Sequence, residues 1–138
     1  MPPRDTRTGA VLERMVLPAL EKGGYAYRTQ QRIGDRLGGG KQIVDVVAET
    51  GSERIIISLK WQQVSGTAEQ KVPFELICLE ETLLTGSYSR AYIVLGGDGW
   101  KLRDFYTSGG LDAYLRLSGK VKILKLEAFV ARANIAAL

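Results

Sequence analysis

The chain has 138 residues, a formal net charge of +4 and an isoelectric point near 9.3. This length is sufficient for one domain with its own core and short for two, so we expect a single domain over residues 1–138. The sequence contains no apolar run near the roughly 18 residues of a membrane span. No apolar stretch precedes the first expected helix either, so we expect a cytoplasmic protein without a signal peptide.

The residue types narrow the chemistry that is open to this chain. It contains no histidine, which excludes Ser-His and Cys-His nucleophiles and the usual zinc sites. The single cysteine, Cys78, lies in an apolar helical stretch and is expected to be a buried structural thiol. An enzyme of this composition must use carboxylates, Lys, Tyr or Ser, together with a hard cation. The modest positive charge is compatible with a polyanionic partner but does not establish one.

The N-terminal half of the chain reads as one helix and three strands. Apolar residues at helical spacing predict a helix over 8–22, which Gly23-Gly24 ends and Pro18 can kink. The segment 32–41 is rich in glycine and is expected to be a flexible loop, and the segment 50–52 a tight turn. Three runs of β-branched and apolar residues predict strands over 25–31, 42–49 and 55–61.

The C-terminal half alternates helices with strands. Since Pro73 suits a first-turn position, a helix is expected from about Val72 to Leu84. A strand over 89–95, a partly helical segment over 101–117, a strand over 121–126 and a helix over 127–138 follow. Three successive strands with short connections indicate an antiparallel meander, and a strand after a helix can pair in parallel through a right-handed crossover. The sequence therefore predicts an α/β fold with a mixed sheet flanked by helices on both sides.

Two charged residues stand out because they lie within otherwise apolar strands. Alternation places Asp45 on one face of its strand, and it places Lys60 and Ser58 together on one face of the next. A carboxylate among valines is costly unless it has a partner. The short turn makes the two strands neighbours, so Asp45 and Lys60 can form a structural cross-strand ion pair. Alternatively, both side chains face a common functional cleft, and the alternation pattern leaves these two interpretations open.

The order of these features resembles the PD-(D/E)xK nuclease superfamily over roughly residues 8–96. The resemblance rests on Glu13 in the first helix, Asp45 on a strand, Ser58-Leu59-Lys60 after a turn, and a polar helix start. It implies a restriction-endonuclease-like fold in which Asp45 binds a metal ion and Lys60 orients the attacking water. It also implies an added metal contact from Glu13 and a catalytic role for Gln62, which resembles a glutamine of several branches.

The sequence departs from the pattern of this superfamily at two positions. Val44 precedes Asp45 where a proline is common, and Ser58 stands where the second carboxylate belongs. Some restriction endonucleases resemble this Ser-x-Lys arrangement and carry the missing acid on the following helix. A metal ion accepts an oxygen ligand from either element. Glu69 and Glu75 are the candidates for this acid, with Glu69 favoured because it lies nearer the end of the strand.

The resemblance implies a DNA endonuclease of restriction, phage or junction-resolving type that uses Mg²⁺ or Mn²⁺ and acts as a homodimer. Arg32, Arg36 and Lys41, in the expected glycine-rich loop, are candidate contacts to DNA phosphates. Two other hypotheses stay open. One is a catalytically inactive module of the same fold that binds DNA or serves in assembly. The other is a globular protein whose Asp45–Lys60 pair is purely structural.

Overall fold

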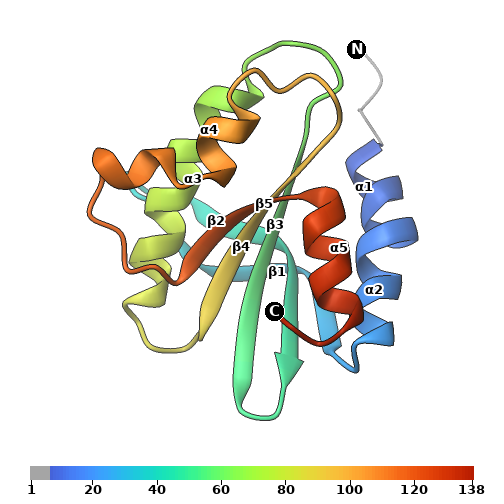
Figure 1. The fold of residues 1–138 in the computed structure, drawn as a ribbon. Coiled ribbons are helices and arrows are strands. Elements are labelled where there is room, and N and C mark those ends of the chain that lie inside the picture. The colour runs from blue at the N-terminus through green and yellow to red at the C-terminus, as the bar shows by residue number, and fades with distance from the viewer. Residues whose placement is uncertain (1–6) are drawn as a thin grey trace.

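The computed structural model describes residues 7–138 as a five-stranded sheet with helices on both faces (Figure 1). The strands are β1 (Ala26–Asp35), β2 (Lys41–Thr50), β3 (Glu53–Trp61), β4 (Arg90–Gly96) and β5 (Val121–Lys125). The helices are α1 (Arg7–Val11), the π-helical turn η1 (Leu12–Val16), α2 (Leu17–Lys22), α3 (Ala68–Leu83), α4 (Arg103–Thr107), the 3₁₀ turn η2 (Gly110–Ala113) and α5 (Leu126–Asn134). Among residues 7–138, no helix combines the length and apolar character that a membrane crossing needs.

The sheet is mixed, as the order of the elements predicts. Strands β1, β2 and β3 pair antiparallel, whereas β3, β4 and β5 pair parallel, in the spatial order β1-β2-β3-β4-β5. Each connection between parallel strands contains helical segments. Helix α3 joins β3 to β4, and α4 with η2 joins β4 to β5. Such connections are the usual way to join parallel neighbours in one sheet.

Two apolar clusters lie on opposite faces of the sheet. On one face α1, α2 and α5 cover residues such as Ile57 and Tyr92, and Tyr92 meets Phe129 edge-on with ring centroids 5.7 Å apart. On the other face α3 covers residues such as Ile56 and Ile93. The alternation of side chains along β3 explains why adjacent isoleucines enter different clusters. Cys78 is buried in α3, as the sequence predicts.

The first helical segment is interrupted, although not by a simple kink at Pro18. The Leu17 N–H donates to the Leu12 carbonyl, which makes the turn η1 a π-helix. Proline has no N–H for the i–4 carbonyl, and its ring crowds the preceding turn. A wider turn immediately before Pro18 accommodates both effects, and the chain stays helical from Arg7 to Lys22.

The segment 32–41 is not the flexible loop expected from its glycines. Strand β1 continues to Asp35 and pairs there with Lys41, so the tip of the hairpin is reduced to residues 36–40. Arg36 N–H donates to the Gly40 carbonyl at 2.9 Å and closes this tip. Glycines 38–40 all have positive φ, which is the backbone conformation that a tight reversal requires.

Helix α3 begins at Ala68, earlier than Pro73 predicts, so this proline lies inside the helix. A proline at this position leaves the Glu69 carbonyl without its usual amide donor. The hydroxyl of Tyr106 donates to that carbonyl at 2.7 Å and replaces the missing bond. A side chain from α4 therefore lets the helix tolerate a residue that would otherwise end it.

Candidate active site

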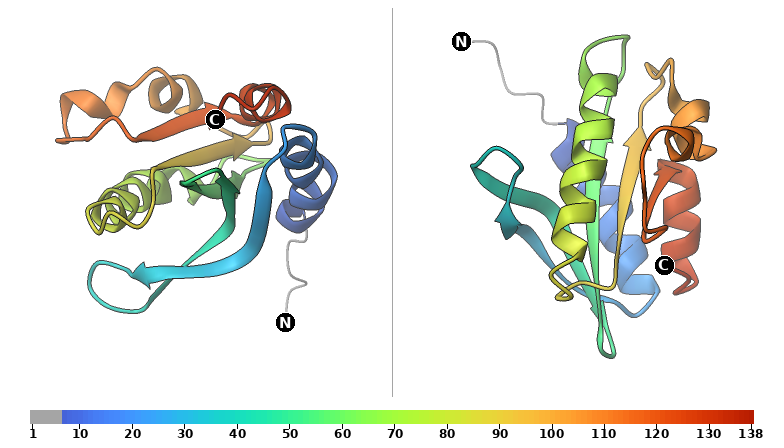
Figure 2. Two further views of the ribbon diagram at one scale, coloured as in Figure 1. Left: turned by 90° about the horizontal axis from the view of Figure 1, so that it is seen from below. Right: turned by 90° about the vertical axis from the view of Figure 1, so that its left-hand side faces the viewer.

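Strands β2 and β3 separate at the centre of the sheet, and this separation creates the site. Their pairing runs from Thr50↔Glu53 to Val46↔Ile57, while the ladder between β1 and β2 continues to the tip of the hairpin. Figure 2 (left) shows the β1–β2 hairpin curving away from β3 toward the side of the sheet that carries α3. Beyond the last pair, the side chain of Asp45 takes the place of a β2 backbone partner. Its Oδ2 accepts a hydrogen bond from the Leu59 N–H at 2.7 Å.

Asp45 lies in an environment that opposes its ionisation. Burial raises the pKa of its carboxyl, and the negative charge of Glu75 raises it further. The hydrogen bond from the Leu59 amide, the charge of Lys60 and the nearby side chain of Gln30 lower it, but the net pKa shift is upward. The charges of Asp45, Lys60 and Glu75 therefore act on one another across the gap between β2 and β3.

Gln30 is a residue of this site that the sequence does not reveal. In the antiparallel register, Thr29 pairs with Val46 and Gln31 with Val44, so Gln30 stands opposite Asp45. Its φ of 51° is left-handed, which is unusual for a non-glycine residue within a strand. Backbone conformations of this kind persist where the surroundings enforce them and are frequent at functional sites.

The second carboxylate of the site comes from α3 and belongs to Glu75. Its Oε1 accepts hydrogen bonds from Ser58 Oγ at 3.1 Å and from Gln42 Nε2 at 3.3 Å. Its Oε2 lies 3.9 Å from Lys60 Nζ and 3.9 Å from Arg36 Nη2. Glu75 is only 4% exposed, and donors from β2, β3 and the hairpin tip surround it. Ser58, at the position of the missing motif acid, thus contacts a carboxylate supplied by the following helix.

Glu69, the favoured candidate from sequence, has a different environment. Its Oε1 accepts hydrogen bonds from the backbone amides of Lys101 and Leu102, the latter at 2.7 Å. These contacts fasten the first turn of α3 to the segment that precedes α4. The structure therefore brings Glu75, and not Glu69, to Asp45 and Lys60.

Two further residues singled out from the sequence lie apart from this cluster. The Gln62 side chain donates to the Gly99 carbonyl at 2.9 Å and accepts from the Ala68 N–H at 3.1 Å. Its amide therefore connects the turn after β4 to the start of α3. Glu13 is exposed on η1 and forms no hydrogen bond or ion pair within residues 7–138. The structure gives Gln62 a loop-bracing position and does not bring Glu13 to Asp45.

The three basic residues of the hairpin are separated by their contacts. Arg36 faces Glu75 and stacks over the Phe74 ring, 5.3 Å from its centroid. Arg32 pairs with Asp35 at 2.8 Å in an exposed position. Lys41 is exposed at the start of β2. Arg36 is therefore the member of this set that the structure brings to the carboxylate cluster.

The donor set fits a hard divalent cation with a partly retained hydration shell. Asp45 and Glu75 supply carboxylate oxygens, the ligand type that Mg²⁺ prefers. The buried Oε1 of Gln42 has no hydrogen-bond partner within the described part of the chain, so an oxygen acceptor beside Glu75 is free. Residues 7–138 contain no group of three or more acidic, histidine or cysteine residues that could hold a metal. Water ligands would therefore complete the coordination, as is usual for Mg²⁺.

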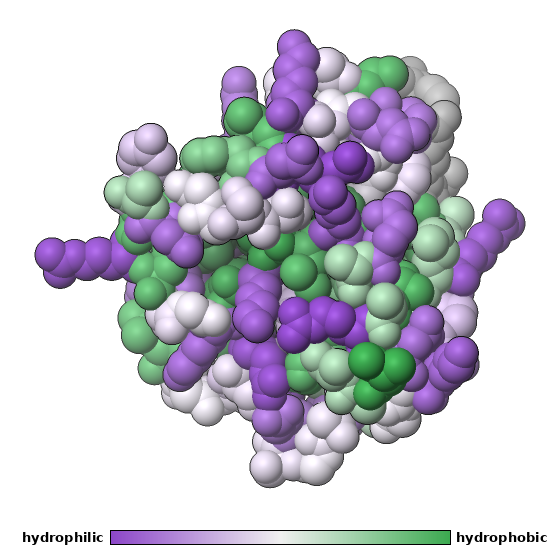
Figure 3. Space-filling model, in the orientation of Figure 1, coloured by the Kyte–Doolittle hydropathy of each residue, from purple (hydrophilic) through white to green (hydrophobic). Residues whose placement is uncertain are grey.

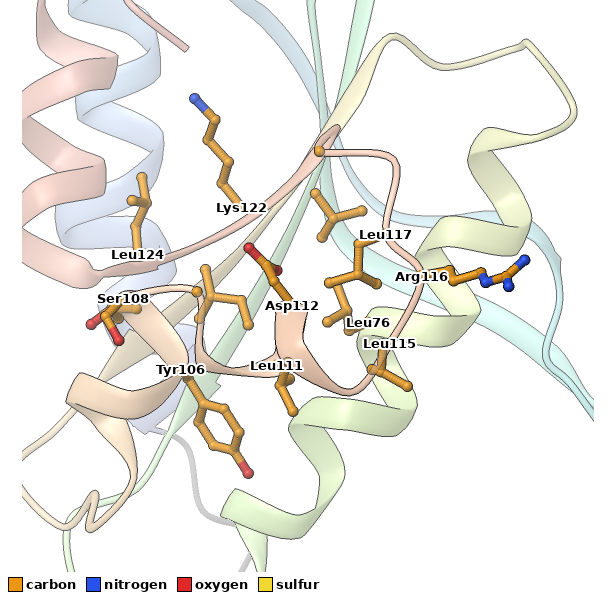
Figure 4. A pocket seen from close by; sticks show the side chains of 15 residues that line it. Leu76, Tyr106, Ser108, Leu111, Asp112, Leu115, Arg116, Leu117, Lys122 and Leu124 are labelled. Carbon is orange, nitrogen blue, oxygen red and sulfur yellow. The ribbon is translucent and has the colours of Figure 1, made fainter.

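A separate cavity of about 730 Å³ lies between η2, β5 and the 114–120 segment (Figure 4). Leucine side chains from α3, η2 and the following loop line much of it, with Asp112 as its single acidic residue. None of the residues that line this cavity belongs to the cluster at Asp45, so the two are distinct. On the face of the molecule that Figure 3 shows, hydrophilic side chains are scattered among hydrophobic ones.

Comparisons with known proteins bear on the fold and the family of this chain. No curated protein matches the sequence. The crystal structure of AF1548, a protein of unknown function, is similar with a TM-score of 0.50 and 17% identity, over 80% of this chain and 54% of that one. This chain thus spans about half the length of that protein, and the similarity supports the fold alone. The model of the PD-(D/E)XK nuclease superfamily domain matches residues 4–136. Together with a mixed sheet that opens at an Asp–Lys–Glu cluster, this match shows that the chain belongs to the PD-(D/E)XK nuclease superfamily.

Proposed function

We propose that this protein is a Mg²⁺-dependent endonuclease that hydrolyses phosphodiester bonds of DNA, with Mn²⁺ as an alternative ion. The observation that carries the proposal is the convergence of Asp45, Glu75 and Lys60 where β2 separates from β3. Two carboxylates in one polar gap can hold a divalent cation, and an amine beside them can face a phosphate, as metal-assisted phosphodiester hydrolysis uses.

Asp45 and Glu75 would hold the cation between β2 and α3. When bound, a divalent cation lowers the pKa of a coordinated water and offsets charge on the phosphate. Lys60 then orients the attacking water or the phosphate oxygens, because its ammonium group lies beside the Glu75 carboxylate. Arg36 offers a second positive charge from the hairpin tip and can contact a phosphate directly.

The charges of the site are balanced without substrate, which supports this division of roles. Lys60 and Arg36 face the Glu75 carboxylate, each at 3.9 Å, while Lys60 also acts on Asp45. A cation bound at the carboxylates would repel Lys60 and Arg36 and leave them available for an anion. The phosphate of a DNA strand is an anion of suitable charge and geometry for both residues.

A plasmid-cleavage assay with and without Mg²⁺ tests this function. We expect Asp45→Asn, Glu75→Gln and Lys60→Met each to lower the cleavage rate by about 100-fold or more. The matched control is Glu69→Gln, which changes a second buried glutamate of the same helix that lies away from the cluster. This control should cleave at close to the rate of the unmodified protein when it is folded. Full activity of Asp45→Asn would contradict the proposal.

A catalytically inactive module that binds DNA or serves in assembly is the second candidate. Two observations favour it. Ser58 replaces the motif acid, and both carboxylate oxygens of Glu75 already have hydrogen-bond or ion-pair partners within the protein. An electrophoretic mobility-shift assay separates the two candidates. A mobility shift of linear and branched DNA, without cleavage in Mg²⁺ or Mn²⁺, would favour the inactive module.

A further inference from the structure

We infer that Gln42 is a direct part of the cation site, with its side-chain carbonyl oxygen facing the bound ion or a water of its hydration shell. The inference rests on the proposed function, because it assumes that Asp45 and Glu75 hold a divalent cation. It assigns a neutral oxygen donor to a site whose charged members are already identified.

The side-chain carbonyl oxygen of Gln42 is a buried acceptor without a partner in the described chain. Gln42 is 2% exposed, and its Oε1 has no hydrogen-bond partner within residues 7–138. Leaving a buried polar oxygen unsatisfied costs about 1–3 kcal/mol. A group that removes this penalty is therefore expected beside Gln42, and both a cation and a cation-bound water do so.

The orientation of the Gln42 amide follows from its contact with Glu75. Gln42 Nε2 donates to Glu75 Oε1 at 3.3 Å, and this contact fixes which end of the amide is nitrogen. The reversed orientation would set two oxygens against each other, so it is excluded by electrostatics. The amide nitrogen thus holds one cation ligand, while the carbonyl oxygen of the same group remains free beside it.

The acidic residues of the site leave room for a neutral oxygen donor. Asp45 and Glu75 are the acidic residues that converge there, and Glu13 is exposed and forms no hydrogen bond or ion pair within residues 7–138. Mg²⁺ accepts carbonyl oxygens as well as carboxylates and waters. A glutamine oxygen adds an acceptor without adding negative charge beside the two carboxylates.

Ser58 provides a matched control for a purely indirect role. Ser58 Oγ donates to the same Glu75 Oε1 atom as Gln42 Nε2, at 3.1 Å. Ser58→Ala removes one donor to Glu75 and leaves the Gln42 carbonyl in place. Gln42→Met removes a donor to the same atom and the free carbonyl as well, with little change in side-chain length. A difference between these two variants therefore reports on the carbonyl oxygen.

The experiment measures Mg²⁺ and Mn²⁺ binding by isothermal titration calorimetry in the absence of DNA, with thermal melts to verify folding. We expect Gln42→Met to weaken binding by about 10- to 100-fold, as is usual for residues that support a metal shell. Ser58→Ala should weaken binding less, and the Mg²⁺-induced rise in Tm should be smallest for Gln42→Met. Gln42→Glu, which restores an oxygen at the carbonyl position, should bind the ions more tightly than Gln42→Met.

Two results would overturn the inference. One is equal affinity for Gln42→Met and Ser58→Ala, and the other is no ion binding by the unmodified protein at millimolar Mg²⁺ or Mn²⁺. A parallel plasmid-cleavage assay keeps the proposed function separate. If the unmodified protein cleaves plasmid but the two variants bind ions with equal affinity, Gln42 is not part of the cation site and the nuclease proposal stands. If ion binding depends on Gln42 but no plasmid is cleaved, the inference about Gln42 stands and the nuclease proposal is wrong.

Discussion

Individual charged residues of the site are readable from the sequence when they interrupt an apolar pattern. Asp45 and Lys60 stand out because their strands are otherwise apolar, and the structure places both at the separation of β2 and β3. Gln30 and Gln42 lack such a signal, since polar residues are common near hairpins. Their importance depends on the register of β1 and on burial beneath α3, which are properties of the folded chain.

The two glutamates of α3 show why the second carboxylate of the site could not be chosen from the sequence. Glu69 is nearer to Lys60 in sequence, but proximity along the chain does not set the direction of a helical side chain. Glu69 lies three positions before Val72 and Glu75 three positions after it, so both share the buried stripe of α3. Helical periodicity therefore predicts burial of both glutamates, and only the folded chain shows that Glu69 meets the backbone before α4 whereas Glu75 meets Ser58 and Gln42.

The raised pKa of Asp45 predicts a cost to stability in the absence of metal. Because the folded-state pKa lies above that of the unfolded chain, the stability contribution of this group is largest at low pH and is lost as the pH rises through the folded pKa. Asp45→Asn removes the charge and keeps an oxygen for the Leu59 amide. We expect its Tm at pH 8 in EDTA to exceed that of the unmodified protein by about 2–4 °C.

The pH dependence of this difference tests its cause. Lowering the pH through the folded pKa neutralises Asp45 in the unmodified protein, so the advantage of Asp45→Asn should shrink. Asp35→Asn is the control, because Asp35 is an exposed partner of Arg32 and its loss should change Tm little. A lower Tm for Asp45→Asn than for the unmodified protein at pH 8 would refute this explanation.

At the scale of elements, the sequence predicts the sheet better than the boundaries. The order of helices and strands and the parallel pairing of β4 with β3 follow from the pattern. The extension of β1 to Asp35 does not, because its hydrogen bonds come from pairing with β2 and leave polar side chains exposed. The start of α3 at Ala68 depends on Tyr106, which is remote in sequence.

Tyr106 is predicted to stabilise α3 through the carbonyl that Pro73 leaves free. Tyr106→Phe keeps the ring and removes the donor to Glu69 O, so a buried carbonyl loses its partner. We expect the free energy of unfolding to fall by about 1–3 kcal/mol in urea denaturation. The double variant Tyr106→Phe with Pro73→Ala should recover part of this loss, because residue 73 then supplies the N–H. Additive effects of the two substitutions would contradict this coupling.

At the scale of the whole molecule, the family could be reached from sequence because element order and motif agree. Glu13, Asp45 and Lys60 come in the expected order, and the superfamily match extends over residues 4–136. The composition of the site could not be completed in the same way. Glu75, Gln42 and Arg36 come from α3, β2 and the hairpin tip, and only the curvature of the hairpin brings them together.

The last prediction concerns assembly on DNA, and it follows from the single Asp45–Glu75 site that we propose for each chain. A duplex has two strands, so double-strand cleavage by one Asp45–Glu75 site per chain calls for two copies of the protein. We therefore expect a homodimer on DNA, with nicked plasmid dominant at low protein concentration and linear plasmid appearing more steeply than in proportion to concentration. Mixing the unmodified protein with excess Asp45→Asn should convert linear product to nicked product, since mixed pairs keep one working site. The prediction is wrong if the amount of linear product falls only in proportion to dilution and the protein sediments on DNA as a monomer. Single chains would then cut both strands in turn.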